Sequence, residues 1–196
     1  MKHVIRIAAL VLTLSLPFAV PATADQFEDG LAAAQSGDFA TALRLWKPLA
    51  DQGYALAQYN LGVTYANGYG VTQDYAAAAA WYRKAADQGH ASAQFNLGFM
   101  YRAGFGVTQD YAAAAEWYRK AADQGYAAAQ SNLGLMYAQG FGVAQDYVQA
   151  HMWFSLAADG GSKEAIKNRD IAAEKMTLEQ IMEAQKLASE WKPKTP

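Results

Sequence analysis

The chain has 196 residues, of which 53% are hydrophobic and 17% charged, and its formal net charge is −2. This composition is typical of a folded domain with a sizeable core and excludes a disordered chain. A nearly balanced charge without a basic cluster argues against nucleic acid as a partner. The absence of cysteine excludes disulfides and thiolate-ligated metals.

Residues 1–24 have the pattern of a secretory signal peptide. Two basic residues near the start precede an apolar run over 7–16, and Ala-Thr-Ala at 22–24 supplies the small residues of a cleavage site. The alternative is an uncleaved anchor helix, for which the apolar run is short. We therefore expect a bacterial periplasmic or secreted protein that is cleaved near Ala24 and has no membrane span after cleavage.

A repeat of 36 residues organises the rest of the chain. The first two full copies differ at nine positions, and a third copy is more divergent. The sequence before them predicts a degenerate hairpin that lacks the long glycine loop, and the sequence after them predicts capping helices and a frayed tail. The expected divisions are a signal peptide (1–24), an N-terminal hairpin (25–53), repeats 1 to 3 (54–89, 90–125 and 126–161), capping helices (162–192) and a tail (193–196).

Each copy predicts two helices. In the second copy, the apolar residues of 91–104 fall on one helical face. Asp110 is a suitable N-cap for the second helix, and Gly125 is suited to the left-handed residue that ends it. Beyond the copies, Thr177 and Gln180 resemble a capping box at the start of a final amphipathic helix. Because one hairpin cannot bury its apolar face alone, we predict an all-α fold, an α-solenoid of stacked antiparallel helix hairpins.

A G-x-G pattern stands before each second helix, as at Gly104 and Gly106. A phosphate-binding loop follows a strand and continues to a third glycine, whereas these pairs follow a helix and recur in every full copy. They therefore predict tight turns with positive φ, and no nucleotide cofactor.

The repeated motif is "A-x-x-x-L-G-x-x-Y-x-x-G-x-G-V-x-x-D-Y-x-x-A", continuing into "W-Y-x-K-A-A-x-x-G". It resembles the Sel1-like repeat, a relative of the tetratricopeptide repeat. The third copy departs from it at Ser155-Leu156, where Arg-Lys is expected. The resemblance implies a right-handed superhelix that acts as a binding scaffold, with the first helix of each hairpin lining the concave surface.

Differences between the first two copies gather on the first helix. Seven of the nine lie on that helix or at its ends, while the framework residues repeat. We expect this variable face to bind a protein or peptide. The alternative is that Tyr59 and Phe95 only pack against a neighbouring helix and that the recurring asparagines satisfy backbone groups. The predicted groove residues are Tyr59, Asn60, Val63, Phe95, Asn96, Phe99, Arg102, Asn132 and Leu135.

No pattern indicates catalysis. His90 and His151 stand where other copies carry Tyr or Ala, and no ligand spacing surrounds them, so we expect no catalytic residue, metal or cofactor. Glu116 is expected to be a solvated charge and Trp117 a core residue. Two other functions stay open: glycan or peptidoglycan binding through the aromatic face, and a β-lactam-related hydrolase. The resemblance suggests the latter only through cysteine-rich relatives, and this chain lacks cysteine.

Overall fold

The computed structural model describes residues 22–194, and every regular element in this range is an α-helix. Residues 1–21 of the expected signal peptide lie outside the described range, and its last three residues form the first turn of α1. No helix in the described range is long and apolar enough to cross a bilayer. The helices are α1 (Ala22–Gln35), α2 (Phe39–Asp51), α3 (Ala55–Asn67), α4 (Tyr75–Asp87), α5 (Ala91–Ala103), α6 (Tyr111–Asp123), α7 (Ala127–Gln139), α8 (Tyr147–Asp159), α9 (Lys163–Ala173) and α10 (Leu178–Glu190).

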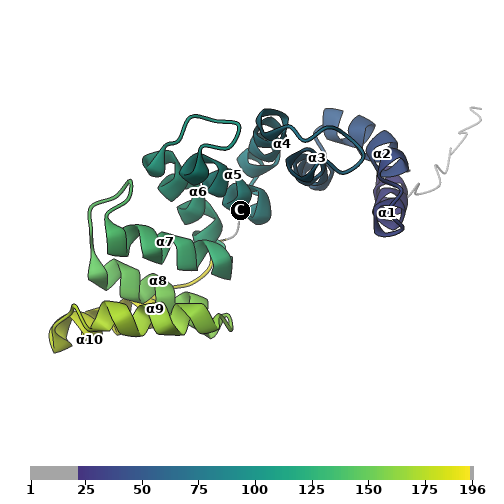
Figure 1. Ribbon diagram of the computed structural model, residues 1–196. Coiled ribbons are helices and arrows are strands. Elements are labelled where there is room, and N and C mark those ends of the chain that lie inside the picture. The colour runs from purple at the N-terminus through teal and green to yellow at the C-terminus, as the bar shows by residue number, and fades with distance from the viewer. Residues whose placement is uncertain (1–21, 195–196) are drawn as a thin grey trace, which may run out of the picture.

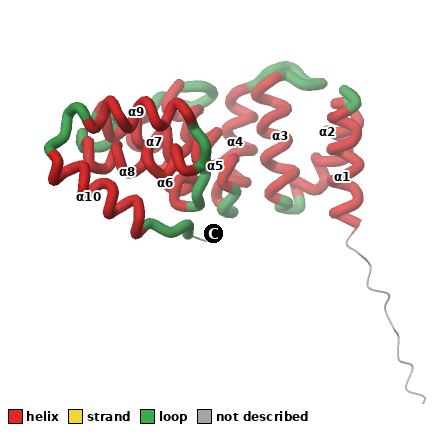
Figure 2. The backbone as a smooth tube through the Cα atoms, turned by 90° about the horizontal axis from the view of Figure 1, so that it is seen from below, coloured by secondary structure: helices red, strands yellow, loops and turns green. Residues whose placement is uncertain are grey.

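Consecutive helices pair and stack into a curved array, so the predicted α-solenoid is confirmed (Figure 1). The hairpins are α1–α2, α3–α4, α5–α6 and α7–α8, and each second helix also packs against the first helix of the next hairpin. In Figure 1, α1, α3 and α5 lie along the inner side of the curve. Figure 2 shows the connecting loops gathered at the two ends of the helices.

Side-chain caps fix where the helices begin and end. The carboxylate of Asp110 accepts a hydrogen bond from the backbone N–H of Ala113 at 3.0 Å, and the aspartates of the other two full copies do the same. Gly125 has a φ of 86°, as expected for the left-handed residue after α6. Thr177 and Gln180 form the predicted capping box at the start of α10.

Small residues allow the two helices of a hairpin to approach closely. Ala114 and Ala121 of α6 are fully buried. A Cβ at Gly98 of α5 would lie only 2.9 Å from the ring of Tyr118, so the aromatic side chain needs this glycine. Trp117 is 7% exposed, which confirms it as a core residue. The interior is therefore built from alanines and glycines that match a few large rings.

Each G-x-G loop packs on the preceding hairpin. Gly106 has a φ of 67°, and a Cβ there would lie 2.2 Å from the carbonyl carbon of Tyr75 at the start of α4. Between the two glycines, the ring of Phe105 stacks on Tyr75 with centroids 4.9 Å apart. Equivalent stacks join Tyr69 to Phe39 and Phe141 to Tyr111. The predicted tight turns are confirmed, and they also join neighbouring hairpins.

Pairs of glutamines, which the sequence analysis did not single out, also link the hairpins, and the accepting residue of each pair is buried. The side-chain amide of Gln94 donates to the backbone oxygen of Ala86 at 3.0 Å. Gln124, one hairpin later, donates to the side-chain oxygen of Gln94 at 2.8 Å. Gln88 donates to Gln58 in the same way, at 2.7 Å. These bonds satisfy polar groups where the helices turn from one hairpin to the next.

The C-terminal segment departs from the repeat because α10 packs against α8. Leu156 of α8 is buried in the core cluster that Trp191 adjoins, which explains why an apolar residue replaces the expected lysine there. The chain end returns towards α6, where Lys194 donates from its backbone N–H and from Nζ to Asp123 at 2.7 and 2.8 Å (Figure 2). The expectation of a frayed tail is therefore wrong up to Lys194.

Candidate binding groove

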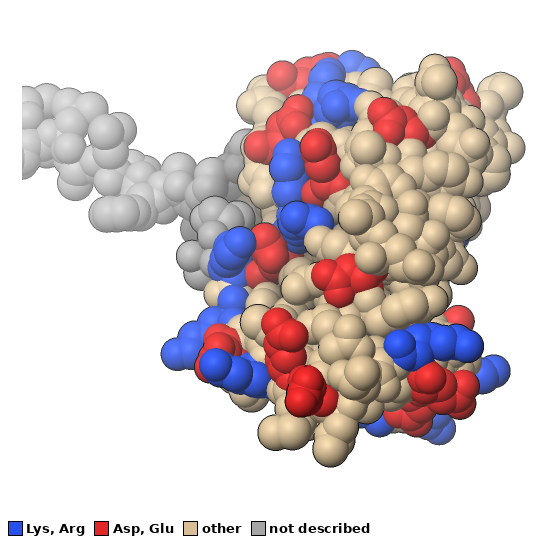
Figure 3. Space-filling view, turned by 90° about the vertical axis from the view of Figure 1, so that its left-hand side faces the viewer, with Lys and Arg blue, Asp and Glu red and all other residues tan. Residues whose placement is uncertain are grey.

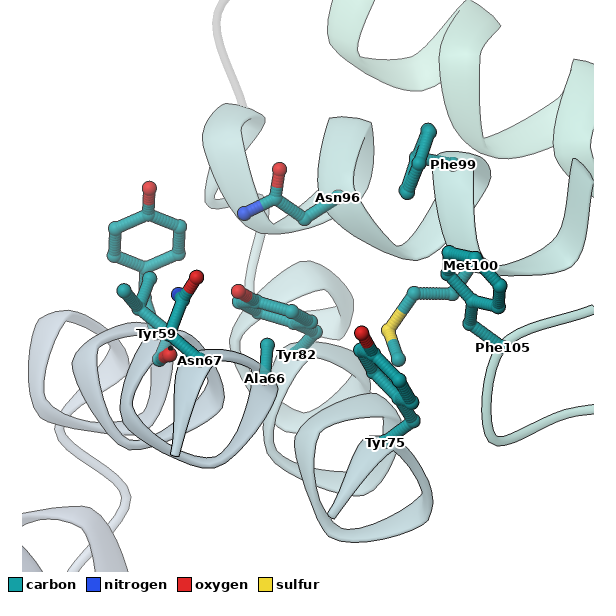
Figure 4. A pocket seen from close by; sticks show the side chains of 10 residues that line it. Tyr59, Ala66, Asn67, Tyr75, Tyr82, Asn96, Phe99, Met100 and Phe105 are labelled. Atoms are coloured by element: carbon teal, nitrogen blue, oxygen red, sulfur yellow. Dashed lines mark hydrogen bonds between the residues drawn. The ribbon is translucent and has the colours of Figure 1, made fainter. Parts of the chain in front are cut away.

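The first pocket lies between α3 and α5, with α4 beneath (Figure 4). Its volume is about 410 Å³. The Asn96 amide extends from α5 towards the space between Tyr59 and Tyr82. The lining residues are Tyr59, Val63, Ala66, Asn67, Tyr75, Tyr82, Asn96, Phe99, Met100 and Phe105.

Two further pockets repeat this arrangement along the array. The second, of about 300 Å³, lies between α5 and α7, and the third, of about 220 Å³, between α7 and α9. The second is lined by Arg102, Ala103, Tyr111, Asn132, Leu135, Met136, Gln139 and Phe141, which include the positions 36 residues after Ala66, Asn67, Tyr75, Asn96, Phe99, Met100 and Phe105. The third is lined by Leu135, Ala138, Gln139, Tyr147, Phe154, Asn168, Ile171, Ala172 and Lys175. We call the three together the pocket row.

The structure brings most of the predicted groove residues into the pocket row. Tyr59, Val63, Asn96 and Phe99 line the first pocket, Arg102 and Asn132 the second, and Leu135 both the second and the third. Asn60 and Phe95 line none of them. The ring of Phe95 packs against Tyr118 and Tyr126, with centroids 5.7 and 5.3 Å away, which is the packing role weighed as the alternative.

Sequence reasoning missed the lining residues on α9. Asn168 lies 36 residues after Asn132, and Ile171 and Lys175 occupy the positions of Leu135 and Gln139. The signal was present, since the same spacing continues beyond Gly161. It was overlooked because the rest of the motif fades there.

The first pocket is aromatic and uncharged. Tyr82 is buried, and its burial raises the pKa of the hydroxyl, which therefore stays protonated. The ring of Tyr59 stacks on His90 with centroids 4.7 Å apart, and burial also raises the pKa of Tyr59. The pocket thus offers apolar surface together with neutral donors and acceptors, a combination that recognises an uncharged side chain and its backbone.

Two charged residues, both basic, line the pocket row. Arg102 is the one charged residue on α3, α5 and α7. Its guanidinium carbon lies 5.5 Å from the ring centroid of Phe99, which places the cation beside the first pocket while it lines the second. Lys175 lines the third pocket.

Both histidines in the described range have structural contacts. Nδ1 of His90 accepts from the backbone N–H of Ala93 at 3.2 Å and so caps α5. His151 is buried, and the hydroxyl of Ser155 donates to its backbone oxygen at 2.9 Å. No cluster of three or more His, Asp or Glu residues suited to a metal occurs in residues 22–194.

One S-x-x-K sequence, which bears on the hydrolase alternative, escaped the sequence analysis. It runs from Ser189 to Lys192, at the exposed end of α10. The hydroxyl of Ser189 donates to the backbone oxygen of Lys186 at 2.8 Å, and neither end of the motif lines the pocket row. The motif therefore lies at an exposed helix end, outside the pocket row.

Comparisons with known proteins agree with the overall fold. A Sel1 repeat crystal structure from Oxalobacter formigenes is 29% identical over 83% of this chain and 74% of its own, with a TM-score of 0.67. A protective antigen of uropathogenic Escherichia coli strains, displaying an SLR fold, is 32% identical with a TM-score of 0.61. The match covers 86% of this chain but 45% of the antigen. No match was found among curated protein sequences. The sequence profile of the Sel1 repeat matches residues 27–54, 55–90, 91–126 and 127–162, so the chain belongs to the Sel1 repeat family.

Proposed function

We propose that this Sel1 repeat protein is a non-catalytic scaffold that binds a protein or peptide partner in the pocket row. The observation that carries the proposal is the recurrence of one pocket at three successive hairpin junctions. Sel1 repeat proteins mediate protein interactions, and an elongated ligand fits a row of equivalent sites better than a compact metabolite does.

The lining chemistry favours a polypeptide. Aromatic walls provide apolar contact, and the amide of Asn96 can both donate to and accept from a peptide group. Phe99 is 39% exposed although it is large and apolar, as expected for a side chain that contacts a partner. A partner would anchor a bulky side chain in the first pocket and extend towards the second and third.

Glycan binding is the less favoured alternative because sugar rings stack on open aromatic faces. Tyr75 and Phe105 stack on one another at 4.9 Å, and Tyr59 stacks on His90. One face of each of these rings is therefore covered by its neighbour, which leaves less open aromatic surface for a sugar ring.

We place this function in the periplasm or outside the cell. The support is the signal-peptide pattern of residues 1–24 and the zero cysteine count, which leaves folding independent of the redox compartment. Figure 3 shows acidic and basic side chains next to one another on the face it displays, beside a broad uncharged area. This mixed surface does not favour nucleic acid.

The proposal is tested by photocrosslinking from inside the first pocket. A photoreactive phenylalanine analogue is placed at position 99 in the full chain and irradiated in a cell-envelope extract of the producing bacterium. The matched control carries the same group at Leu178, which is 73% exposed on α10 and lies outside the pocket row. We expect one polypeptide to be crosslinked from position 99 and not from position 178.

Two results would contradict the proposal. Capture of a muropeptide or polysaccharide without a polypeptide would favour the glycan alternative. Identical products from the two positions would mean that the first pocket has no partner of its own.

A further inference from the structure

We infer that the pocket row selects an acidic polypeptide segment: a bulky apolar side chain fills the first pocket, and Asp or Glu side chains pair with Arg102 and Lys175. The inference rests on the proposed function and narrows it to one class of partner.

The first support is the sign of the charges. None of the residues that line the three pockets is acidic, although the chain has 18 acidic and 16 basic residues. Other hollows on the array mix both signs. One beside α6 contains Glu116 and Asp123 together with Arg119, and another contains Asp87 with Lys120. The pocket row therefore differs from these two hollows, because its only charged residues are cations.

The second support is that neither cation has an acidic partner among the described residues. Neither Arg102 nor Lys175 forms an ion pair within residues 22–194, and both side chains are exposed. The guanidinium carbon of Arg102 lies 5.5 Å from the ring centroid of Phe99, and this contact orients the guanidinium. A guanidinium held in this way can bind a carboxylate through two parallel hydrogen bonds.

The third support is that the fold does not require these cations. The position of Arg102 is occupied by Ala66 and Ala138 in the neighbouring copies. The position of Lys175 is occupied by Ala103 and Gln139. The two cations are thus particular to their junctions, as expected of residues that contact a ligand rather than support the framework.

The arrangement also predicts the order of the ligand's features. The first pocket is uncharged, whereas the second and third contain one cation each. One terminal carboxylate cannot reach two separate pockets, so two side-chain carboxylates along one segment match the row better. Both lie on the same side of the apolar anchor.

The test is a selection of random dodecapeptides on the full chain, carried out with three proteins. These are the wild type, the double variant R102Q/K175Q, and the control R44Q/K186Q. The control removes an arginine and a lysine from exposed positions outside the pocket row. We expect wild type and control to enrich Asp and Glu on one side of an apolar anchor. R102Q/K175Q is expected to keep the anchor and lose the acidic preference.

Affinity measurements on a selected peptide give the size of the effect. An exposed ion pair contributes up to about a fivefold change in Kd, so R102Q and K175Q are each expected to weaken binding roughly threefold to fivefold. Binding to the wild type should weaken with added salt more steeply than binding to the double variant. Amidation of the peptide's C-terminus should leave the affinity unchanged.

The outcomes separate this inference from the proposed function. Anchored peptides without an acidic preference, or equal affinity for R102Q/K175Q, would overturn the inference while leaving peptide binding intact. Loss of binding on amidation would overturn it in favour of a terminal carboxylate. Selected peptides whose binding is unaffected by F99A would overturn both, because they would bind outside the pocket row.

Discussion

Replacing Gly106 by alanine tests how the hairpins are joined. The new Cβ would lie 2.2 Å from the carbonyl carbon of Tyr75, which is too close for any real contact, so the loop must move away from α4. A left-handed conformation adds about 1–2 kcal/mol for a residue with a Cβ. Loss of the stack between Phe105 and Tyr75 adds about 0.5–1.5 kcal/mol. We expect G106A to lower the free energy of unfolding by about 2–4 kcal/mol, including the displaced loop.

The assay is urea unfolding followed by tryptophan fluorescence and far-UV circular dichroism. Gly37 provides the matched control because its φ is also positive, at 83°, while a Cβ there meets nothing within 4 Å. G37A should therefore show the conformational cost alone, about 1–2 kcal/mol. Equal midpoints for G106A and G37A would refute the close-approach argument. G106A should also weaken peptide binding, since Phe105 lines the first pocket.

Three further predictions concern the core, pH and the chain end. W117A should cost about 3–5 kcal/mol in thermal or urea melts, and an unchanged melt would contradict its burial. Burial, together with the nearby Arg169, holds the pKa of His151 below its usual 6.5. The free energy of unfolding should therefore be highest above pH 6.5 and fall as the pH drops below 6.5. In melts from neutral to acidic pH, H151A should show a weaker dependence of stability on pH than the wild type. W191A should lower the free energy of unfolding in urea by about 2 kcal/mol, because it removes apolar packing. D123N should lower it by less than about 1 kcal/mol, because it removes only an exposed ion pair. A larger effect of D123N than of W191A would contradict this account of the tail.

Most of the fold was predictable because the repeats confirm one another. The 36-residue period predicted the hairpins, and Asp110 caps α6 as expected. The separation of constant from variable positions also led to seven residues that line the pocket row. Periodicity works here because each residue type recurs in the same packing environment.

The sequence could not predict contacts between helices where those contacts depart from the 36-residue period. The last helix, predicted to be amphipathic, leaves the large apolar residues Leu178 and Met182 exposed, because α10 packs against α8 through a face that includes Ala184 and Leu187. Phe95 was expected in the groove because it occupies the position of Tyr59. It packs against Tyr126 instead, whereas Tyr59 meets His90 at the equivalent place and still borders a cavity.

The pockets form between hairpins rather than within them, and this bears on how such arrays diversify. Each module contributes one wall to the pocket before it and one to the pocket after it, as α5 does through Phe99 and Arg102. Duplicating a module therefore adds one pocket to the row, and exchanging a module changes the lining of two adjacent pockets at once. Within this architecture, a new ligand preference can arise by recombining whole modules, while the glycine loop of each full copy still joins it to the preceding hairpin.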